Sequence, residues 1–183
     1  MKKLPTIHGS RVIGEGGRFA VEQLDLEFSN GARRTYERMH GSGRGAVVVV
    51  PLLDEATVLL IREYACGLHT YELGLPKGRL ERGEDVLEGA QREIKEEIGY
   101  GARRLRHIGR LSLAPTYMSH QTQVVLAQDL YPERLPGDEP EELEVVPWKL
   151  DDLARLVQRE DVTEGRSIAA LFMVRELLRA GAL

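Results

Sequence analysis

A group of acidic residues between Gly78 and Tyr100 is the part of this sequence best suited to chemistry. Glu93 and Glu97 are four residues apart, so on a helix their side chains project from the same face, with Glu96 beside them. Like charges at this spacing disfavour a helix by about 0.2–0.5 kcal/mol per pair. The arrangement therefore indicates a site that gathers a hard cation, and oxygen ligands favour Mg²⁺, Mn²⁺ or Ca²⁺ over zinc.

The same stretch predicts the helix that would position these glutamates. Val86, Ala90, Ile94 and Ile98 recur every four residues and form one apolar stripe, so that face is expected to pack inward. Glycines before and after the stripe favour a loop–helix–loop. The alternative is a solvated acidic face that is held by charge pairs and has no ligand.

The spacing of the residues in this stretch resembles the signature of the Nudix hydrolases, G-x5-E-x7-R-E-U-x-E-E-x-G-U, where U is a bulky apolar residue. The matching positions are Gly78, Glu84, Arg92, Glu93, Ile94, Glu96, Glu97, Gly99 and Tyr100. Only Tyr100 departs from the pattern, because an aliphatic residue is commoner there. The resemblance implies a hydrolase that holds divalent metal and cleaves a nucleoside diphosphate linked to another group.

The resemblance also implies roles for individual residues of the box. Glu93 and Glu97 would be metal ligands, with Glu96 alongside, and the carbonyl oxygen of Lys77 would be a backbone ligand. Glu96 and Glu97 would thereby act in catalysis. Mg²⁺ is the expected ion, with Mn²⁺ as a substitute. Arg92 is expected to orient the glutamates, and Glu84 to anchor the loop by pairing with a basic group.

A second acidic segment, DEPEELE at residues 138–144, is the expected source of a further catalytic carboxylate. In Nudix enzymes that act on ADP-ribose, a glutamate in a mobile loop commonly activates the water or completes the metal shell. Glu139 and Glu141 are the first candidates here, and Glu142 and Glu144 are reserves. An acidic solvated loop without function is the alternative.

The resemblance extends beyond the box. The run LLIREYACGLHTYELGLPKGRLERGE is similar to the region before the box in ADP-ribose pyrophosphatases, which implies that Arg62, Glu72 and Arg79 face phosphate or metal. That family typically has Ala-Gly where this chain has Lys77-Gly78, so a cation is added at the mouth. Pro115 lies at the spacing associated with ADP-ribose hydrolysis, and Tyr117 resembles an aromatic position associated with diadenosine polyphosphates.

The segments LDLEFSNG, LIREYA, AQDLYPE and GDEPE resemble one Nudix subfamily, the bacterial ADP-compounds hydrolases, from Phe19 to Leu178. That subfamily takes ADP-ribose, NADH and diadenosine polyphosphates and releases AMP. Its polar N-terminal hairpin usually contributes to a homodimer, in which the pocket can include residues of the neighbouring chain. This implies that Glu37 and Arg38 contact adenine or ribose. The alternatives are a solvated ribbon, a module that senses ADP-ribose without cleaving it, or a hydrolase of another nucleotide such as the NAD-capped end of an RNA.

The remaining elements predict an α/β (α+β) fold, with a mixed β-sheet between helical layers as in Nudix α/β/α sandwiches. Asn30-Gly31 predicts an antiparallel hairpin over 19–39, with a bulge near residues 22–23. A joint at 40–45 would separate an N-terminal extension (1–45) from a Nudix domain (46–183). The expected strands are 47–50 with 58–62 as its partner, 71–75, 106–113, 123–127 and 145–148. Two helices, 150–159 and 164–179, would follow.

Composition limits the classes of partner. The net charge of −4 argues against an extended nucleic-acid surface, which is normally basic. The longest apolar run, residues 46–53, contains Pro51 and falls well short of a membrane span. The start of the chain has no apolar segment typical of a secretory signal. Cys66 is the only cysteine, so we expect a packed thiol and a reducing, cytoplasmic location. A small nucleotide is the expected partner.

Overall fold

The computed structural model describes residues 2–16, 19–40 and 45–183. Positions 41–44, within the predicted joint at 40–45, lie outside this range. The chain divides into two compact units, each described by itself below. One comprises Met1–Gly45 with Ser112–Gln121, and the other comprises Ala46–Leu111 with Thr122–Leu183.

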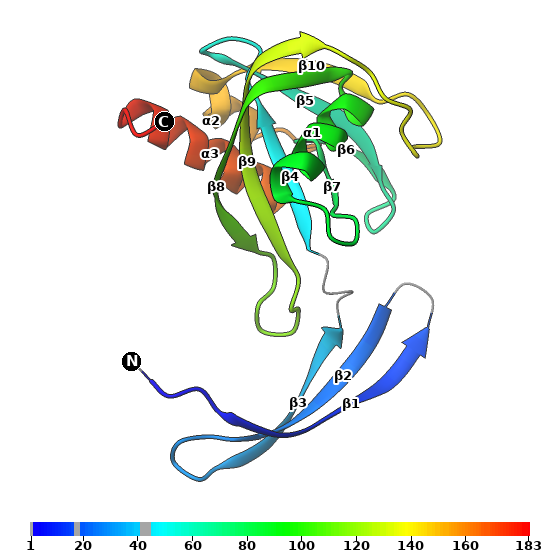
Figure 1. Ribbon diagram of the computed structural model, residues 1–183, viewed down its shortest axis with the longest axis vertical. Helices are drawn as coiled ribbons and strands as arrows, with labels where there is room; N and C mark the ends of the chain where they lie inside the picture. Colours follow the sequence, from blue (N-terminus) through cyan, green and yellow to red (C-terminus); the bar gives the residue numbers. More distant parts are fainter. Residues whose placement is uncertain (1, 17–18, 41–44) are drawn as a thin grey trace. The chain divides into compact units, whose positions relative to one another are not determined.

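The N-terminal unit contains a three-stranded antiparallel sheet of order β1-β2-β3, formed by Thr6–Gly16, Phe19–Glu27 and Arg33–His40 (Figure 1). The predicted hairpin at Asn30-Gly31 is confirmed. Gly31 has a φ of 81°, and the Asn30 side chain accepts a hydrogen bond from the Ala32 amide at 3.1 Å. Strand β1 is an additional strand that the sequence did not predict. The predicted bulge also lies elsewhere: β2 and β3 pair in unbroken register, and the shifts occur in β1 before Gly9 and Gly14.

The second unit contains two sheets. The first has the order β7-β4-β9-β8 and is mixed, because β4 is parallel to β9 and antiparallel to β7. The second is antiparallel, with order β10-β5-β6. The strands are β4 (Ala46–Pro51), β5 (Thr57–Ala65), β6 (Thr70–Gly74), β7 (Lys77–Arg79), β8 (Tyr100–Ser112), β9 (Gln121–Pro132) and β10 (Glu144–Lys149). The prediction that strand 58–62 pairs with 47–50 was therefore wrong, since β4 and β5 belong to different sheets.

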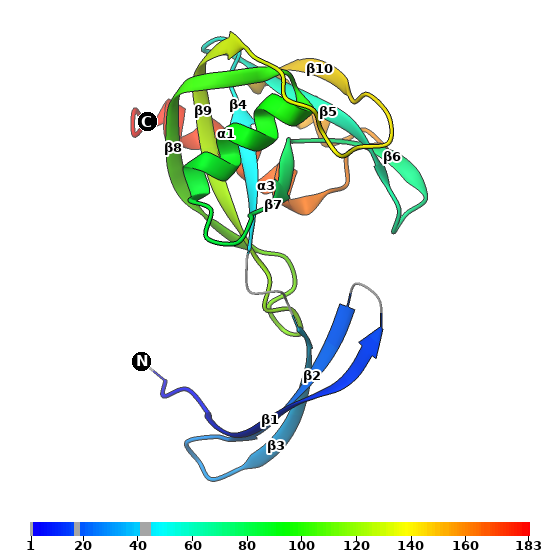
Figure 2. The same cartoon turned by 45° about the vertical axis from the view of Figure 1, so that its right-hand side comes forward.

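The helices of this unit are α1 (Val86–Glu97), a 3-10 turn η1 (Leu150–Asp152), α2 (Leu153–Leu156) and α3 (Gly165–Arg179). The helix predicted over 150–159 is thus shorter. Helix α1 lies on one side of β4 and α3 on the other (Figures 1 and 2). Because side chains alternate along a strand, Val47 and Val49 pack with Ile94 of α1, while Val48 and Val50 pack with Leu171 of α3. The predicted α/β/α arrangement is confirmed.

The ends of helix α1 follow from local sequence. Asp85 caps its first turn by accepting a hydrogen bond from the Leu87 amide at 2.8 Å, and Glu88 completes a capping box. Gly99 follows the helix with a φ of 72°, a conformation that favours glycine. Ala90, Ile94 and Ile98 are buried as the periodicity predicted. The apolar face of α1 is therefore fixed against the core. This packing sets the direction in which the glutamates of the same helix project.

The prediction of a packed thiol was wrong. Cys66 lies exposed in the turn between β5 and β6. Within the described residues, no helix has both the length and the apolar character that crossing a membrane requires.

Ser167 connects α3 to the strand that precedes the box. Its hydroxyl donates to Glu164 at 2.8 Å and accepts from the Leu75 amide at 3.0 Å, and the residue is 1% exposed. Ser167→Ala would leave the Leu75 amide without this acceptor, so we expect a loss of about 1–3 kcal/mol in the free energy of unfolding, measured by urea denaturation. Glu160→Ala, at an exposed position, is the control. An equal midpoint for Ser167→Ala and the wild type would contradict this role.

Candidate functional site

Two glutamates of α1 pack directly against strand β7. Glu93 and Glu97 are 6% and 7% exposed. The Lys77 amide donates to a carboxylate oxygen of Glu97 at 3.0 Å. A Cβ added at Gly78 would lie 2.1 Å from a carboxylate oxygen of Glu93. Only glycine therefore lets the strand approach the helix this closely, and the two carboxylates fill the space that results.

Burial makes this pair electrostatically unfavourable when both groups are charged. Desolvation raises the pKa of Glu93, although the neighbouring Arg92 guanidinium opposes the shift. It also raises the pKa of Glu97 to about 9; the charge of Lys77 opposes that shift, and the charge of Glu93 adds to it. A cation placed between the two carboxylates would remove this penalty.

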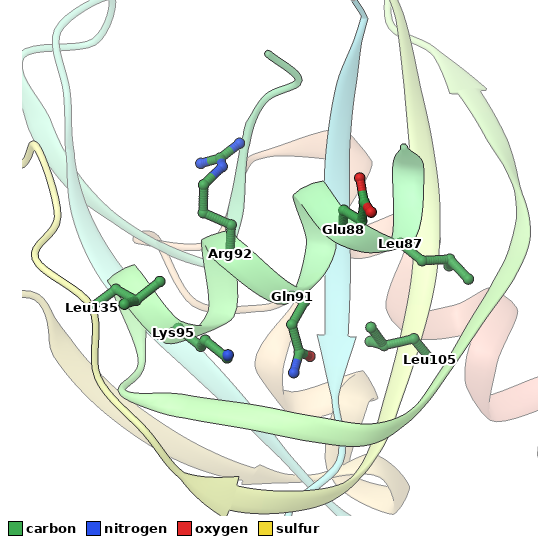
Figure 3. A pocket seen from close by; sticks show the side chains of 7 residues that line it. All are labelled: Leu87, Glu88, Gln91, Arg92, Lys95, Leu105 and Leu135. Atoms are coloured by element: carbon green, nitrogen blue, oxygen red, sulfur yellow. The ribbon is translucent and has the colours of Figure 1, made fainter. Parts of the chain in front are cut away.

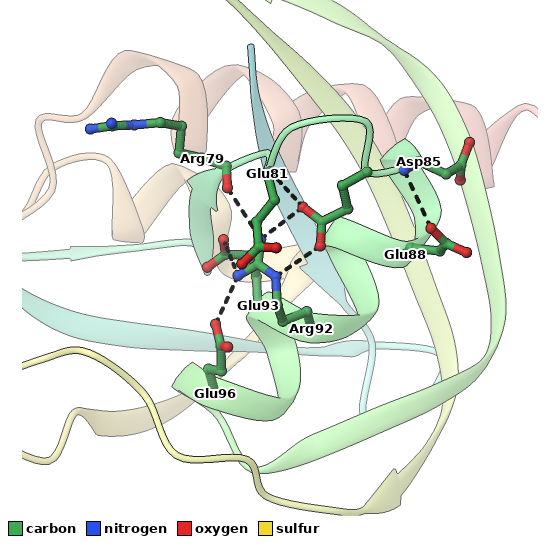
Figure 4. Close-up of polar contacts among 8 residues, drawn as sticks. Arg79, Glu81, Asp85, Glu88, Arg92, Glu93 and Glu96 are labelled. Carbon is green, nitrogen blue, oxygen red and sulfur yellow. Dashed lines mark hydrogen bonds and ion pairs between the residues drawn. The ribbon is translucent and has the colours of Figure 1, made fainter. Parts of the chain in front are cut away.

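Arg92 supplies part of the compensating charge, and its contacts are drawn in Figure 4. Its guanidinium pairs with both carboxylate oxygens of Glu84 at 2.8 and 3.0 Å. It also donates to Glu93 and Glu96, at 2.9 Å each, and to the carbonyl oxygen of Arg79 at 3.1 Å. These bonds raise the pKa of Arg92, with Glu84 as the largest cause, and lower that of Glu84. The predicted ion pairs of Arg92 with the box glutamates are present at Glu93 and Glu96, and Glu84 pairs with a basic group as predicted.

The donor set suits a divalent cation with oxygen ligands. Glu93 and Glu97 are buried carboxylates beside the backbone of Lys77, and Glu96 is partly exposed at the same helix face. In the described part of the chain, no three His, Cys, Asp or Glu side chains converge closely enough to hold a metal by themselves. Mg²⁺ is commonly held by one or two carboxylates, with waters and substrate phosphates completing its shell. The residues present therefore fit such an ion.

Lys77 contributes a positive charge beside these carboxylates. Its ammonium group pairs with Glu63 of β5 at 2.5 Å, and the two side chains are 19% and 28% exposed. The sequence reasoning did not single out Glu63, whose position is apparent only once β5 and β6 pair. Glu139 also lies within the field of these groups: partial desolvation and the charges of Glu63 and Asp138 raise its pKa, and Lys77 lowers it.

The other glutamates of the 138–144 segment have different neighbours. Glu141 accepts a hydrogen bond from the hydroxyl of Tyr71. Glu142 lies 3.9 Å from Arg134, and Glu144 pairs with Arg62 at 2.8 Å. The glutamates of this segment therefore have different partners, and the charges of Lys77 and Glu63 act on Glu139.

The residues predicted ahead of the box have structural partners. Arg62 pairs with Asp161 at 2.6 Å in addition to Glu144. Glu72 is 9% exposed and accepts bonds from the amide and hydroxyl of Thr163 at 2.9 and 2.8 Å. Arg79 is exposed, and its side chain extends away from the glutamates of α1 (Figure 4). The contacts of Arg62 and Glu72 join the β5–β6 hairpin to the segment before α3.

Four predicted residues belong to the N-terminal unit. Arg38 donates to Glu22 at 2.7 Å, and Glu37 accepts from Gln23 at 3.3 Å. Pro115 and Tyr117 are exposed on the segment that joins β8 to β9. The carbonyl oxygen of Tyr117 accepts a hydrogen bond from the Met39 amide at 2.7 Å, so this segment is attached to β3.

A pocket of about 440 Å³ lies along the outer face of α1 (Figure 3). Its lining comprises Leu87, Glu88, Gln91, Arg92, Lys95, Leu105 and Leu135. Glu93, Glu96 and Glu97 do not line it, because they project from other faces of the helix. This pocket is therefore separate from the carboxylates.

Comparison with known proteins agrees with this geometry. Residues 43–171 match the NUDIX domain, and residues 5–38 match the NudE-type Nudix hydrolase N-terminal domain. The chain is 50% identical over 175 residues to the ADP compounds hydrolase NudE of Escherichia coli (strain K12), covering 96% of this chain and 94% of that protein. It is 30% identical over 160 residues to an ADP-ribose pyrophosphatase of Bacillus subtilis (strain 168), covering 85% of each.

A solved structure supports the same conclusion. The crystal structure of an ADP compounds hydrolase superposes with a TM-score of 0.89 at 48% identity, covering 100% of this chain and 99% of that one. Nudix hydrolases generally need a divalent metal ion, in keeping with the carboxylates on α1. Sequence, fold and site agree: this chain belongs to the Nudix hydrolase family.

Proposed function

We propose that this protein hydrolyses the pyrophosphate bond of ADP-linked compounds and releases AMP, with Mg²⁺ as the working ion and Mn²⁺ as a substitute. The observation that carries the proposal is the burial of Glu93 and Glu97 against the backbone of β7. The names of the similar proteins support the substrate class: one is an ADP compounds hydrolase and one an ADP-ribose pyrophosphatase. ADP-ribose, NADH and diadenosine polyphosphates are the proposed substrates.

The residues of α1 and β7 have different roles in this reaction. Glu93 and Glu97, with Glu96 and the Lys77 carbonyl, would hold the ion. When bound, the ion neutralises phosphate charge and lowers the pKa of a water. Arg92 keeps Glu93 and Glu96 in position through its 2.9 Å contacts. The ammonium group of Lys77 adds positive charge where an anionic pyrophosphate would bind.

A carboxylate of the acidic loop would position the attacking water. We favour Glu139 over Glu141, because Glu139 interacts with Lys77 and Glu63 while Glu141 is bonded to Tyr71. A raised pKa suits a general base, since it brings the group closer to neutral pH. Arg62, Glu72 and Arg79 remain proposed contacts to phosphate or metal; the first two would have to exchange their present partners.

The N-terminal sheet supports a proposed homodimer. Ile7, Val12 and Ile13 of β1 are 57%, 45% and 46% exposed, so this strand presents apolar surface that a second copy could cover. Glu37, Arg38, Pro115 and Tyr117 would then contribute to nucleotide binding within the dimer. We place the protein in the cytoplasm, where a thiol as exposed as that of Cys66 stays reduced.

Two alternative functions would give different experimental results. A sensor would bind ADP-ribose and yield no AMP, yet Glu93, Glu96 and Glu97 are all kept, and binding alone does not require that set. A hydrolase of NAD-capped RNA ends would prefer a capped oligonucleotide to free NADH.

Replacing Glu97 with Gln keeps the shape of the side chain and removes its charge. We expect kcat/KM for ADP-ribose at saturating Mg²⁺ to fall by at least about a hundredfold. Glu88→Gln is the matched control on the same helix, because glutamine can also complete the capping box and should leave activity near that of the wild type. Activity largely retained in Glu97→Gln would refute the metal site.

Metal binding should be linked to pH. The pKa of Glu97 is raised from 4.5 to about 9, so the folded metal-free protein binds this proton more tightly than the unfolded chain does. Its stability should therefore decrease as pH rises through that interval. Mg²⁺ needs the deprotonated carboxylate, so the increase in Tm on adding Mg²⁺ should grow with pH across the same interval. Glu97→Gln should flatten both trends, and a Mg²⁺ effect independent of pH would contradict the linkage.

Product analysis tests the substrate class. We expect Mg²⁺-dependent formation of AMP with ribose 5-phosphate from ADP-ribose, with reduced nicotinamide mononucleotide from NADH, and with ADP from diadenosine triphosphate. Chromatography with and without EDTA provides the measurement, and kcat/KM ranks the compounds. Binding of ADP-ribose without AMP would instead indicate the sensor.

A further inference from the structure

The acidic segment between β9 and β10 is anchored firmly at both ends. After β9, Glu133 pairs with Lys95 at 2.9 Å, and the Leu135 amide donates to the Lys95 carbonyl at 3.1 Å. At the other end, Glu144 begins β10 and pairs with Arg62 at 2.8 Å. The residues between, 138–143, have no regular secondary structure, and this part of the chain lies beside the β5–β6 hairpin (Figures 1 and 2).

One hydrogen bond connects the middle of this segment to that hairpin. The hydroxyl of Tyr71 in β6 donates to the carboxylate of Glu141, seventy residues away in the sequence. The pair between Arg134 and Glu142 is longer, at 3.9 Å, and its side chains are 50% and 83% exposed, so it restrains the segment weakly.

Tyr71 is itself held in place by its neighbours. Its ring meets that of Tyr64 edge to face, with 5.8 Å between centroids. The Tyr64 hydroxyl is hydrogen-bonded to Nδ1 of His69 at 2.7 Å. Aromatic pairs in this geometry attract each other, so the Tyr71 hydroxyl is presented from a supported ring.

We propose that Tyr71 is a positioning residue that holds the 138–143 segment through Glu141 and thereby keeps Glu139 next to the end of α1, where a Cβ added at Gly137 would lie 3.7 Å from the carbonyl oxygen of Glu96. The proposal rests on the proposed function, in which Glu139 positions the attacking water. Glu141 is then an anchor, not a second base. Residues 139 and 141 are two apart, so a displacement of one moves the other.

The strength of this contact sets the size of the expected effect. A single hydrogen bond to an exposed carboxylate shifts an equilibrium by only about tenfold.

Nuclear magnetic resonance relaxation tests the contact without depending on activity. Tyr71→Phe removes only the hydroxyl, and Tyr64→Phe removes a hydroxyl from the same hairpin that bonds to His69. In the full-length protein we expect the backbone order parameters of 138–143 to fall towards the values below about 0.6 that mark flexible backbone in Tyr71→Phe and Glu141→Ala, and to keep their wild-type values in Tyr64→Phe. Unchanged order parameters in Tyr71→Phe would overturn the proposal.

Kinetics tests the consequence for Glu139. Tyr71→Phe and Glu141→Ala should each lower kcat for ADP-ribose by about threefold to tenfold with KM within about twofold, and the double variant should lose no more than either alone. Glu139→Gln should lose more than these, and adding Tyr71→Phe to it should have little further effect. Additive losses in either double variant would overturn the positioning role.

The two measurements separate the two proposals. A wild-type protein that releases no AMP from any ADP-linked compound in Mg²⁺ would refute the proposed function, and the relaxation experiment would still decide the contact. An active wild type with Tyr71→Phe indistinguishable from Tyr64→Phe would refute the positioning role and leave the function standing.

Discussion

The packing of Glu93 against Gly78 and of Glu97 against the Lys77 amide is the interaction on which the site depends. Glu93 lies so close to Gly78 that a methyl group there would overlap its oxygens. Such burial is costly for charged groups, and the fold supports it from several sides. The Asp85 cap fixes the start of α1, the Ile94 stripe fixes its rotation, and β7 pairs with the fully buried β4.

One arginine distributes its charge over the acidic helix. Arg92 bonds to Glu84, Glu93 and Glu96, whereas Glu97 accepts a hydrogen bond from the Lys77 amide. A single guanidinium thus holds the loop at Glu84 and two glutamates of the helix together. Because a buried charge left without its partner is strongly unfavourable, the geometry of this group is tightly constrained.

Local patterns predicted the parts of the fold that depend on neighbours in sequence. The four-residue period of Ile94 and its companions predicted α1, and Asn30-Gly31 predicted its hairpin, because each is determined within a few residues. Strand β1 was missed because glycines at 9 and 14 interrupt its alternation at two register shifts. The 47–50 and 58–62 stretches resemble two arms of a hairpin, yet they belong to different sheets. The sheet that each stretch joins depends on its pairing with β9 or β10, and these two strands lie far along the chain.

The functional site shows the same difference between features that nearby residues determine and features that distant strands determine. That the glutamates of α1 project from one helix face could be predicted from their spacing alone. The pairs of Lys77 with Glu63 and of Tyr71 with Glu141, in contrast, form only when distant strands and loops meet. Nothing in the spacing of residues 138–144 separates Glu139 from Glu141. Their different neighbours come from the path of the segment over the β5–β6 hairpin.

The alternating valines of β4 divide the interior into two compartments, one beneath α1 and one beneath α3. Substitutions that improve packing beneath α3 can raise the stability of the whole unit without altering any side chain next to Glu93. Evolution can therefore change the stability of the unit through residues on one face of β4 and the reaction through residues on the other face. A lineage that adapts to heat can keep its reaction centre unchanged.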